Sequence, residues 1–184
     1  MMNIVALVGS LRKDSYNRKL AEFMRERYKD KFQLDIADIG ALPHYNQDDE
    51  LDPPEVVAAF KRQVADVDGV LIVTPEYNWS VPGVLKNALD WLSRVDKVLV
   101  NKPVMIVGVS TGMMGTIRAQ LHLRQILQSP GLAAKVLPPA GNEVLINFVN
   151  QKFDESGQLT DAATIQLLDQ VIERFVQWIA QSGR

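Results

Sequence analysis

Most of the information about the fold lies in residues 69–91, Gly-Val-Leu-Ile-Val-Thr-Pro-Glu-Tyr-Asn-Trp-Ser-Val-Pro-Gly-Val-Leu-Lys-Asn-Ala-Leu-Asp-Trp. The segment starts with a continuous apolar run, which is typical of a strand covered on both faces. It ends with apolar residues at helical spacing. The loop at residues 74–82 therefore lies at the carboxyl end of a strand, which is where open α/β sheets bind ligands.

The same order of strand, loop and helix recurs along the chain. Apolar runs, or an alternating pattern in the case of the second strand, predict strands at residues 4–8, 32–39, 69–74 and 104–110. A fifth strand is predicted at residues 134–137 and 144–146, with an interruption at 138–141, Pro-Pro-Ala-Gly. Helical spacing predicts helices at residues 16–28, 54–66, 83–94 and 116–128, and a last one that Thr160 or Asp161 caps.

Strands that alternate with helices in this way indicate a parallel sheet with helices on both faces. At a length of 184 residues we expect a single domain, residues 1–184. The natural arrangement is an α/β fold, a flavodoxin-like three-layer sandwich whose five-stranded parallel sheet has the order 2-1-3-4-5. This choice rests on analogy as well as on the pattern.

The composition excludes several classes of function. The formal net charge is −2, which gives no electrostatic reason to expect nucleic acid or an anionic membrane as a partner. The chain has no cysteine and two histidines, His44 and His122, so we expect no disulfide, no thiol chemistry and no metal site. No signal-peptide pattern is visible at residues 1–8, and we expect a cytoplasmic protein.

The loop after the first strand has the residue types of an anion site. Residues 9–17, Gly-Ser-Leu-Arg-Lys-Asp-Ser-Tyr-Asn, precede a helix, and helix amino termini attract anions. Ser10, Ser15 and Asn17 are neutral donors, and Arg12 has a guanidinium suited to phosphate. A single glycine favours a terminal monophosphate over a bridging pyrophosphate. The alternative is a serine-rich helix cap with exposed basic residues.

Two other loops favour a planar ring. Residues 75–82 combine two prolines with Tyr77 and Trp79 as flat surfaces, although a rigid packed loop would have the same composition. Residues 110–116 contain glycines that let the backbone approach a ligand, or else form a tight turn that Thr116 caps. Strands 1, 3 and 4 are neighbours in the predicted order, so these loops would offer a phosphate site and two walls for one ligand, a flavin.

The chain resembles the NADPH-dependent FMN reductase family, in the branch of bacterial quinone, azo-dye and chromate reductases. The motifs that carry the resemblance are residues 9–17, residues 75–91 and residues 110–124, Ser-Thr-Gly-Met-Met-Gly-Thr-Ile-Arg-Ala-Gln-Leu-His-Leu-Arg. The chain departs from the family pattern at Thr116, where a second glycine is usual, and at Leu121, where relatives often have tyrosine. The resemblance implies that Ser10, Arg12, Ser15 and Asn17 hold the FMN phosphate, that Pro75, Glu76, Tyr77 and Asn78 line the ring and ribityl chain, and that Ser110 and Gly112 reach the pyrimidine edge.

The function that follows from the resemblance is an FMN-dependent NAD(P)H oxidoreductase. It would pass electrons by a ping-pong mechanism to quinones, azo compounds, free flavin or chromate-like acceptors, and no catalytic side chain is nominated because the flavin carries the chemistry. The alternatives are a flavodoxin-type electron carrier and a binding protein without turnover. We expect a homodimer or homotetramer, because the helix with Trp91 and Leu92 places apolar residues beside the loop at 75–82. The physiological acceptor and the choice between NADPH and NADH are not readable from the sequence.

Overall fold

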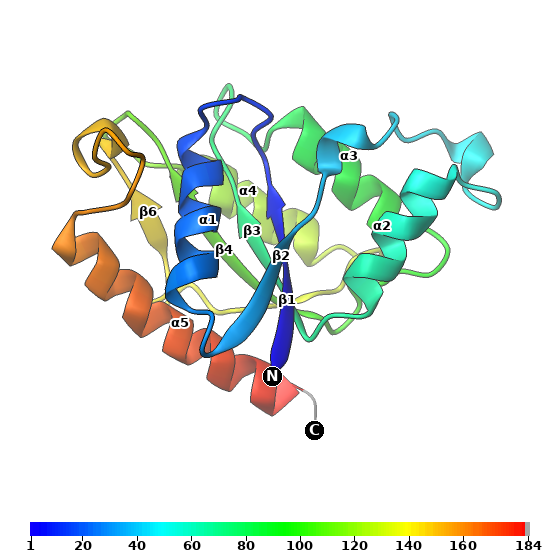
Figure 1. Cartoon of the computed structure of the whole chain (residues 1–184). Helices are drawn as coiled ribbons and strands as arrows, with labels where there is room; N and C mark the ends of the chain where they lie inside the picture. The colour runs from blue at the N-terminus through cyan, green and yellow to red at the C-terminus, as the bar shows by residue number, and fades with distance from the viewer. Residues whose placement is uncertain (183–184) are drawn as a thin grey trace.

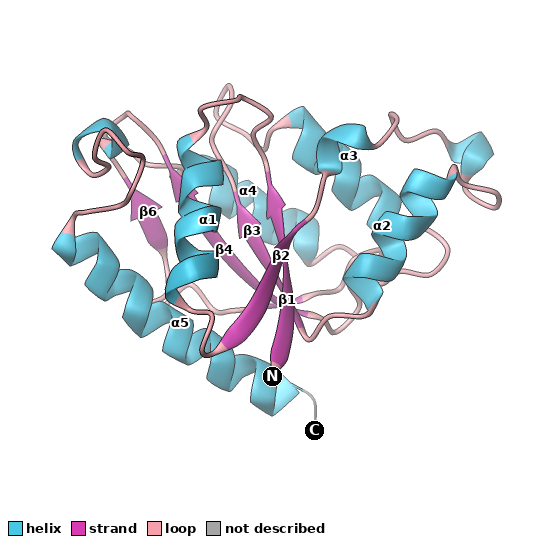
Figure 2. Cartoon of the chain, viewed as in Figure 1, coloured by secondary structure: helices cyan, strands magenta, loops and turns pink. Residues whose placement is uncertain are grey.

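The computed structural model describes residues 1–182, in which helices and strands alternate along the chain (Figures 1 and 2). The strands are β1 (Met2–Val8), β2 (Phe32–Ile36), β3 (Gly69–Val73), β4 (Pro103–Val109), β5 (Lys135–Val136) and β6 (Val144–Ile146). The helices are α1 (Tyr16–Arg27), α2 (Glu55–Ala65), α3 (Gly83–Leu92), α4 (Ile117–Leu127) and α5 (Ala162–Ser182).

The sheet has the order β2-β1-β3-β4-β5, and all its strand pairs are parallel, which confirms the predicted arrangement. The predicted interruption of the fifth strand divides it into two short strands, which pair with different parts of β4. β5 lies beside the start of β4, and β6 lies beside its end. The structure therefore has a sixth strand along one edge of the sheet.

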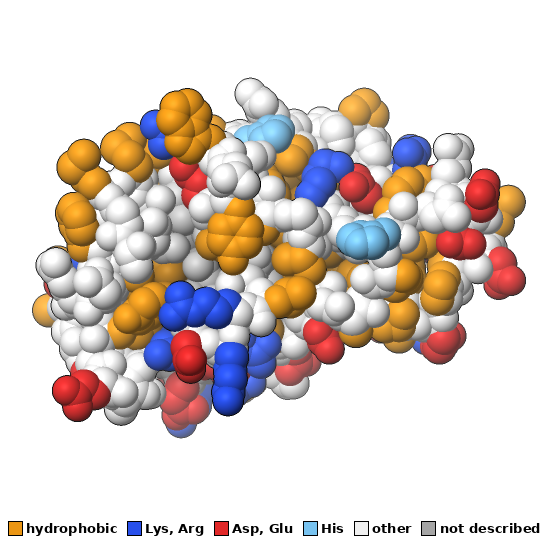
Figure 3. Space-filling view, turned by 90° about the horizontal axis from the view of Figure 1, so that it is seen from above, with side chains coloured by type: hydrophobic (Ala, Val, Ile, Leu, Met, Phe, Trp, Pro, Cys, Tyr) orange, Lys and Arg blue, Asp and Glu red, His pale blue; other side chains and the backbone are white. Residues whose placement is uncertain are grey.

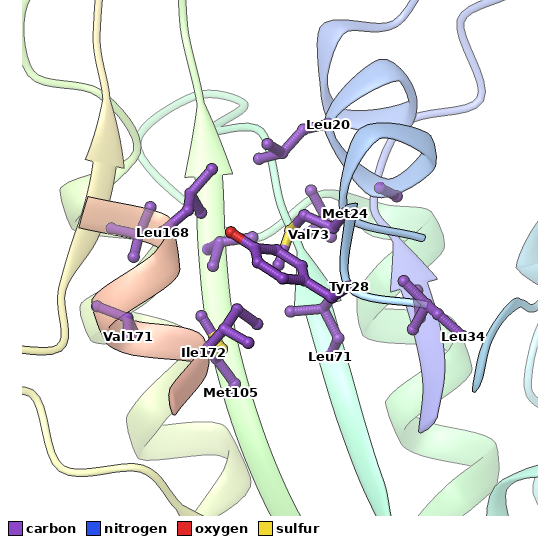
Figure 4. Close-up of a cluster of buried hydrophobic side chains, with 14 of the residues drawn as sticks. Leu20, Met24, Tyr28, Leu34, Leu71, Val73, Met105, Leu168, Val171 and Ile172 are labelled. Carbon is purple, nitrogen blue, oxygen red and sulfur yellow. The ribbon is translucent and has the colours of Figure 1, made fainter. Parts of the chain in front are cut away.

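Helices cover both faces of the sheet, and each face has its own apolar core. One core packs α1 and α5 against the sheet, and the other packs α2, α3 and α4 against the opposite face. Figure 4 shows part of the first core, in which the ring of Tyr28 lies among side chains of α1, α5 and the central strands. Its hydroxyl donates to the Asp169 carboxylate on α5 over 2.9 Å, which joins the two helices of this layer.

The edge strand β2 is shorter than predicted. Its alternating pattern was expected to run to residue 39, but the strand ends at Ile36. The Asp38 side chain accepts a hydrogen bond from the Gly40 backbone N–H and starts a short 3₁₀ turn, Ile39–Ala41. Ile39 is buried against the α2, α3 and α4 layer, so its apolar side chain belongs to a turn rather than to the strand.

The starts of α2 and α5 can be compared with the prediction. Pro54 is the N-cap of α2, not its first helical residue as predicted. Asp161 caps α5, as one of the two predicted candidates, because its carboxylate accepts from the Thr164 backbone N–H over 3.0 Å. Within residues 1–182 the helices include none with the length and apolar character needed to span a bilayer.

Candidate functional site

A cleft of about 200 Å³ opens at the carboxyl ends of β1, β3 and β4. The strand arrows in Figure 1 point toward this edge, and Figure 3 looks down on it. The two neighbours of β1 are β2 and β3, so the chain reverses its direction across the sheet here, the position at which such sheets bind ligands. The residues that line the cleft are Ser10, Arg12, Ser15, Tyr16, Asn17, Pro75, Glu76, Tyr77, Val109, Ser110, Thr111 and Val149.

Eight of the ten residues predicted for the site line this cleft, which brings together segments about 100 residues apart in the chain. The exceptions are Asn78 and Gly112, which lie in the adjoining loops but not in the cleft wall. Sequence reasoning missed four of the lining residues, Tyr16, Val109, Thr111 and Val149. Tyr16 and Thr111 were inside the quoted motifs, whereas nothing in the sequence around Val149 pointed to the site.

The loop after β1 supplies the cationic end of the cleft. Arg12 is exposed and forms no ion pair with a carboxylate of the described residues 1–182. Ser15 is the N-cap of α1, and its hydroxyl oxygen accepts from the Arg18 backbone N–H over 3.4 Å, which leaves the hydroxyl proton available to a ligand. The first turn of α1 has no acidic residue, so the positive end of the helix dipole favours an anion at this end of the cleft.

Asn17 joins the α1 layer to the end of β4. Its side chain is buried, its Nδ2 donates to the Val109 carbonyl and its Oδ1 accepts from the Val109 N–H, both over 3.2 Å. The amide thus satisfies both backbone groups of Val109, as a neighbouring strand would. One N–H of Nδ2 remains for the predicted contact with a phosphate.

Glu76 reaches from the loop after β3 to the first turn of α4. Its Oε2 accepts from the backbone N–H groups of Arg118, over 2.9 Å, and Ala119, over 3.1 Å. Thr116 is the N-cap residue of this helix, as the alternative interpretation had it, but its side chain makes no capping hydrogen bond. Its buried hydroxyl instead accepts from the Gln120 amide over 3.0 Å. A carboxylate from a different loop therefore caps α4.

Residues 77–80 form a two-residue hairpin that projects from the cleft. Asn78 and Trp79 have φ angles of +50° and +64°, and Tyr77 and Ser80 exchange both backbone hydrogen bonds, at 3.1 and 3.0 Å. Two successive residues with positive φ define a type I′ turn, whose twist suits such a hairpin. The Tyr77 hydroxyl lies 3.4 Å from the Ser10 hydroxyl, so the hairpin also reaches the loop after β1.

Contacts with α4 hold this hairpin in place. The Arg118 guanidinium stacks 4.2 Å above the Trp79 ring, and the Ser80 hydroxyl lies 2.8 Å from His122 Nδ1. Both aromatic rings of the hairpin remain exposed, with 49% of Tyr77 and 71% of Trp79 accessible to solvent. His122 is exposed and is a hydrogen-bond partner of the hairpin.

The loop after β4 closes the other side of the cleft. The Ser110 hydroxyl accepts from the Gly112 N–H over 3.0 Å, which engages the backbone donor predicted to reach a ring edge. Gly108, in the strand before this loop, lies so close to Thr116 and to the Thr74 carbonyl that a Cβ there would lie 2.1 and 2.4 Å from their oxygens. Close packing of β4 against the start of the loop after β3 and the end of the loop after β4 therefore fixes the cleft.

Large apolar side chains are exposed on the loops around the cleft and on α4. Figure 3 shows hydrophobic side chains gathered on this face of the molecule. We call this set the apolar rim; it consists of Tyr77, Trp79, Met113, Met114, Leu121 and Phe148, each at least 40% exposed. By contrast, Trp91 and Leu92 lie in the core, where the Trp91 indole donates to the Pro43 carbonyl over 2.9 Å.

Comparison with known proteins gives the same result for the family and for the fold. The model of the NADPH-dependent FMN reductase family matches residues 2–151. A 2-hydroxy-1,4-benzoquinone reductase of a Burkholderia species is 42% identical over 180 residues, which are 97% of this chain and 96% of that protein. A quinone reductase of Escherichia coli K12 is 37% identical over 182 residues, 97% of this chain and 95% of that protein. The flavoenzyme FerB, an NAD(P)H:(acceptor) oxidoreductase from Paracoccus denitrificans, superimposes with a TM-score of 0.89 at 34% identity, covering 99% of both chains.

Proposed function

Because the chain belongs to the NADPH-dependent FMN reductase family, we propose that it oxidises NAD(P)H through bound FMN and passes the electrons to quinones by a ping-pong mechanism. Azo compounds, free flavin and chromate-like oxyanions are further acceptors in this proposal. The observation that carries it is the meeting of three strand-end loops at one cleft, with a cation at one end and flat aromatic surfaces beside it.

The residues of the cleft fit FMN. Arg12, the Ser15 hydroxyl and the amino terminus of α1 form a donor set for a terminal phosphate. The loops after β3 and β4 supply backbone and hydroxyl groups for a heteroatom-rich ring. A volume of about 200 Å³ is below the range of roughly 300–1,000 Å³ that is usual for ligand pockets, so the open cleft encloses only part of a molecule of this size.

FMN, when bound, supplies the hydride and electron transfer, and the protein supplies position and electrostatics. In our proposal Arg12 and Ser15 hold the phosphate, and the hairpin at residues 77–80 limits access to one side of the ring. One accessible ring face must then serve the nicotinamide and the acceptor in turn, which is the reason to propose ping-pong kinetics. No acidic or basic side chain is needed to move a proton in this scheme.

The quinone class is supported by relatives named as quinone reductases that cover nearly the whole chain. The decisive experiment adds NADPH or NADH anaerobically to the purified, flavin-loaded protein and follows the visible flavin absorbance, then adds a quinone. We expect the flavin absorbance to bleach with the nicotinamide and to recover with the quinone. In steady-state assays, double-reciprocal plots of rate against nicotinamide concentration should be parallel at several quinone concentrations. Intersecting lines would contradict the ping-pong mechanism, and absence of bleaching with either nicotinamide would favour the electron-carrier alternative.

We also propose that the chain assembles as a homodimer or homotetramer through the apolar rim. The residues first suggested for such a contact, Trp91 and Leu92, are buried within their own chain. The exposed side chains of the rim form the kind of surface that marks a protein interface. Light scattering should give at least twice the monomer mass, and Met113→Asp should reduce it; a wild-type monomer would contradict the proposal.

A further inference from the structure

Glu76 gives the cleft an electrostatic polarity. Among the described residues that line the cleft it is the sole acidic side chain, and Arg12 is the sole basic one. Arg12 follows β1, where the donors for a phosphate gather, whereas Glu76 follows β3, in the loop that leads to the aromatic hairpin. A ligand with its phosphate at Arg12 therefore has the Glu76 carboxylate on the side of its ring.

The structure holds this carboxylate firmly. Its side chain is 11% exposed, and two backbone N–H groups of α4 donate to Oε2. The Arg118 guanidinium lies 3.4 Å from Oε1 and is itself stacked on Trp79. Glu76 thus fixes the loop after β3 to the start of α4, and it occupies the positive end of that helix.

Occupation of this helix end has a consequence for a flavin. A free helix amino terminus beside the ring would stabilise the negative charge that the flavin gains on reduction. Here the carboxylate satisfies those N–H groups and adds a negative charge of its own, which disfavours a second negative charge nearby. Both effects make the reduced, anionic ring less stable relative to the oxidised ring.

We propose that Glu76 is a positioning residue that fixes the loop after β3 onto α4 and that its charge lowers the reduction potential of the bound flavin. The inference rests on the proposed function, since it requires FMN in this cleft. A lower potential makes the reduced cofactor a stronger donor to acceptors, so Glu76 would set the range of acceptors that the protein can reduce.

Two substitutions, of which the first is isosteric, separate this role from a purely structural one. Glu76→Gln keeps an oxygen that can accept from the two N–H groups but removes the charge. The variant should bind reduced FMN about tenfold more tightly relative to oxidised FMN, which raises the two-electron potential by about 30 mV. Arg118→Gln removes the neighbouring cation and should shift the potential in the opposite direction by a smaller amount, because Arg118 is more exposed.

The control is Glu173→Gln, which makes the same change in net charge on α5. Glu173 pairs with Lys31 there and does not line the cleft. Its potential should equal that of the wild type. Potentials are measured by equilibration of the flavin-loaded proteins with a reference dye, and oxidised FMN affinity is measured by fluorescence titration.

Equal potentials for the wild type and Glu76→Gln would overturn the proposal. If Glu76→Gln does not fold, Arg118→Gln decides, and an unchanged or raised potential in that variant would overturn it. Failure of the wild-type protein to bind FMN is a separate result, because it would overturn the proposed function itself.

Discussion

Replacement of Asn17 by alanine should destabilise the fold far more than its position in the first turn of α1, beside a ligand loop, suggests. The side chain satisfies both backbone polar groups of Val109, a residue with 2% of its surface exposed. In Asn17→Ala the Val109 N–H and C=O lose these partners. Each buried polar group without a partner costs about 1–3 kcal/mol. The two groups together would cost about 2–6 kcal/mol, and because single substitutions rarely cost more than about 4 kcal/mol, we expect a loss of about 2–4 kcal/mol in the free energy of unfolding.

For a chain of this length, 1 kcal/mol changes the melting temperature by about 2–4 °C, so the expected decrease is about 4–16 °C. The assay is thermal unfolding followed by circular dichroism, with flavin-free protein at one fixed concentration so that ligand and subunit binding do not differ. Asn150→Ala, at an exposed asparagine, is the control and should melt like the wild type. A melting temperature of Asn17→Ala within about 2 °C of the wild type, half of the smallest expected decrease, would refute the reasoning.

Three further variants test other parts of the structure. Arg12→Ala should weaken FMN binding about 10–100-fold, the cost of a lost charged hydrogen bond, and leave riboflavin binding unchanged because riboflavin has no phosphate. Gly108→Ala should cost about 1–3 kcal/mol in unfolding free energy by overpacking against Thr116. Asp169→Asn should lower the melting temperature at neutral pH, because hydrogen bonding from Arg27 lowers the pKa of the Asp169 carboxyl. That stabilisation is present above the unfolded pKa of about 3.9 and is lost as pH falls further, so the two melting temperatures should converge below about pH 4.

Neighbouring positions provide the controls for these variants. Lys13→Ala removes the same charge beside Arg12 but does not line the cleft, so equal losses of FMN affinity in both would contradict a specific phosphate contact. Gly83→Ala adds a methyl group where no atom lies within 4 Å, and it should not destabilise the protein as Gly108→Ala does. A difference in melting temperature between Asp169→Asn and wild type that persisted below the lowered, folded-state pKa of Asp169 would mean that the pair contributes through packing rather than charge.

The order of the strands was predictable because burial leaves a direct record in the sequence. β3 is apolar at every position and is covered on both faces, whereas β2 alternates and lies at the edge. The end of β2 was predicted three residues too late. Ala37 and Asp38 already break the alternation, and the hydrogen bond from the Gly40 N–H to the Asp38 side chain turns the chain there. A period of two identifies a strand and does not show where a local polar contact ends it.

The location of the site was predictable for a related reason, since parallel strands place their carboxyl ends at one edge. The contacts of its polar side chains were not. Asn17 pairs with a residue 92 positions away, and Glu76 pairs with backbone groups 42 and 43 positions away. The local pattern favoured Thr116 as the cap of α4. No sequence motif shows that a distant carboxylate, that of Glu76, accepts from the N–H groups at that helix end.

These long-range contacts decide how the cleft is held before any ligand binds. Asn17 links α1 to β4, Glu76 links the loop after β3 to α4, and the Tyr77 hydroxyl contacts Ser10 across the cleft. The loops after β1 and β3 are thus joined to each other, and α1 and the loop after β3 are joined to β4 and α4, by hydrogen bonds that the protein forms on its own. Binding a ligand then costs less conformational entropy than ordering free loops would, since the positions of the donors are already fixed. By this argument, substitutions that break the ties should weaken FMN binding even where the altered side chain does not touch the flavin.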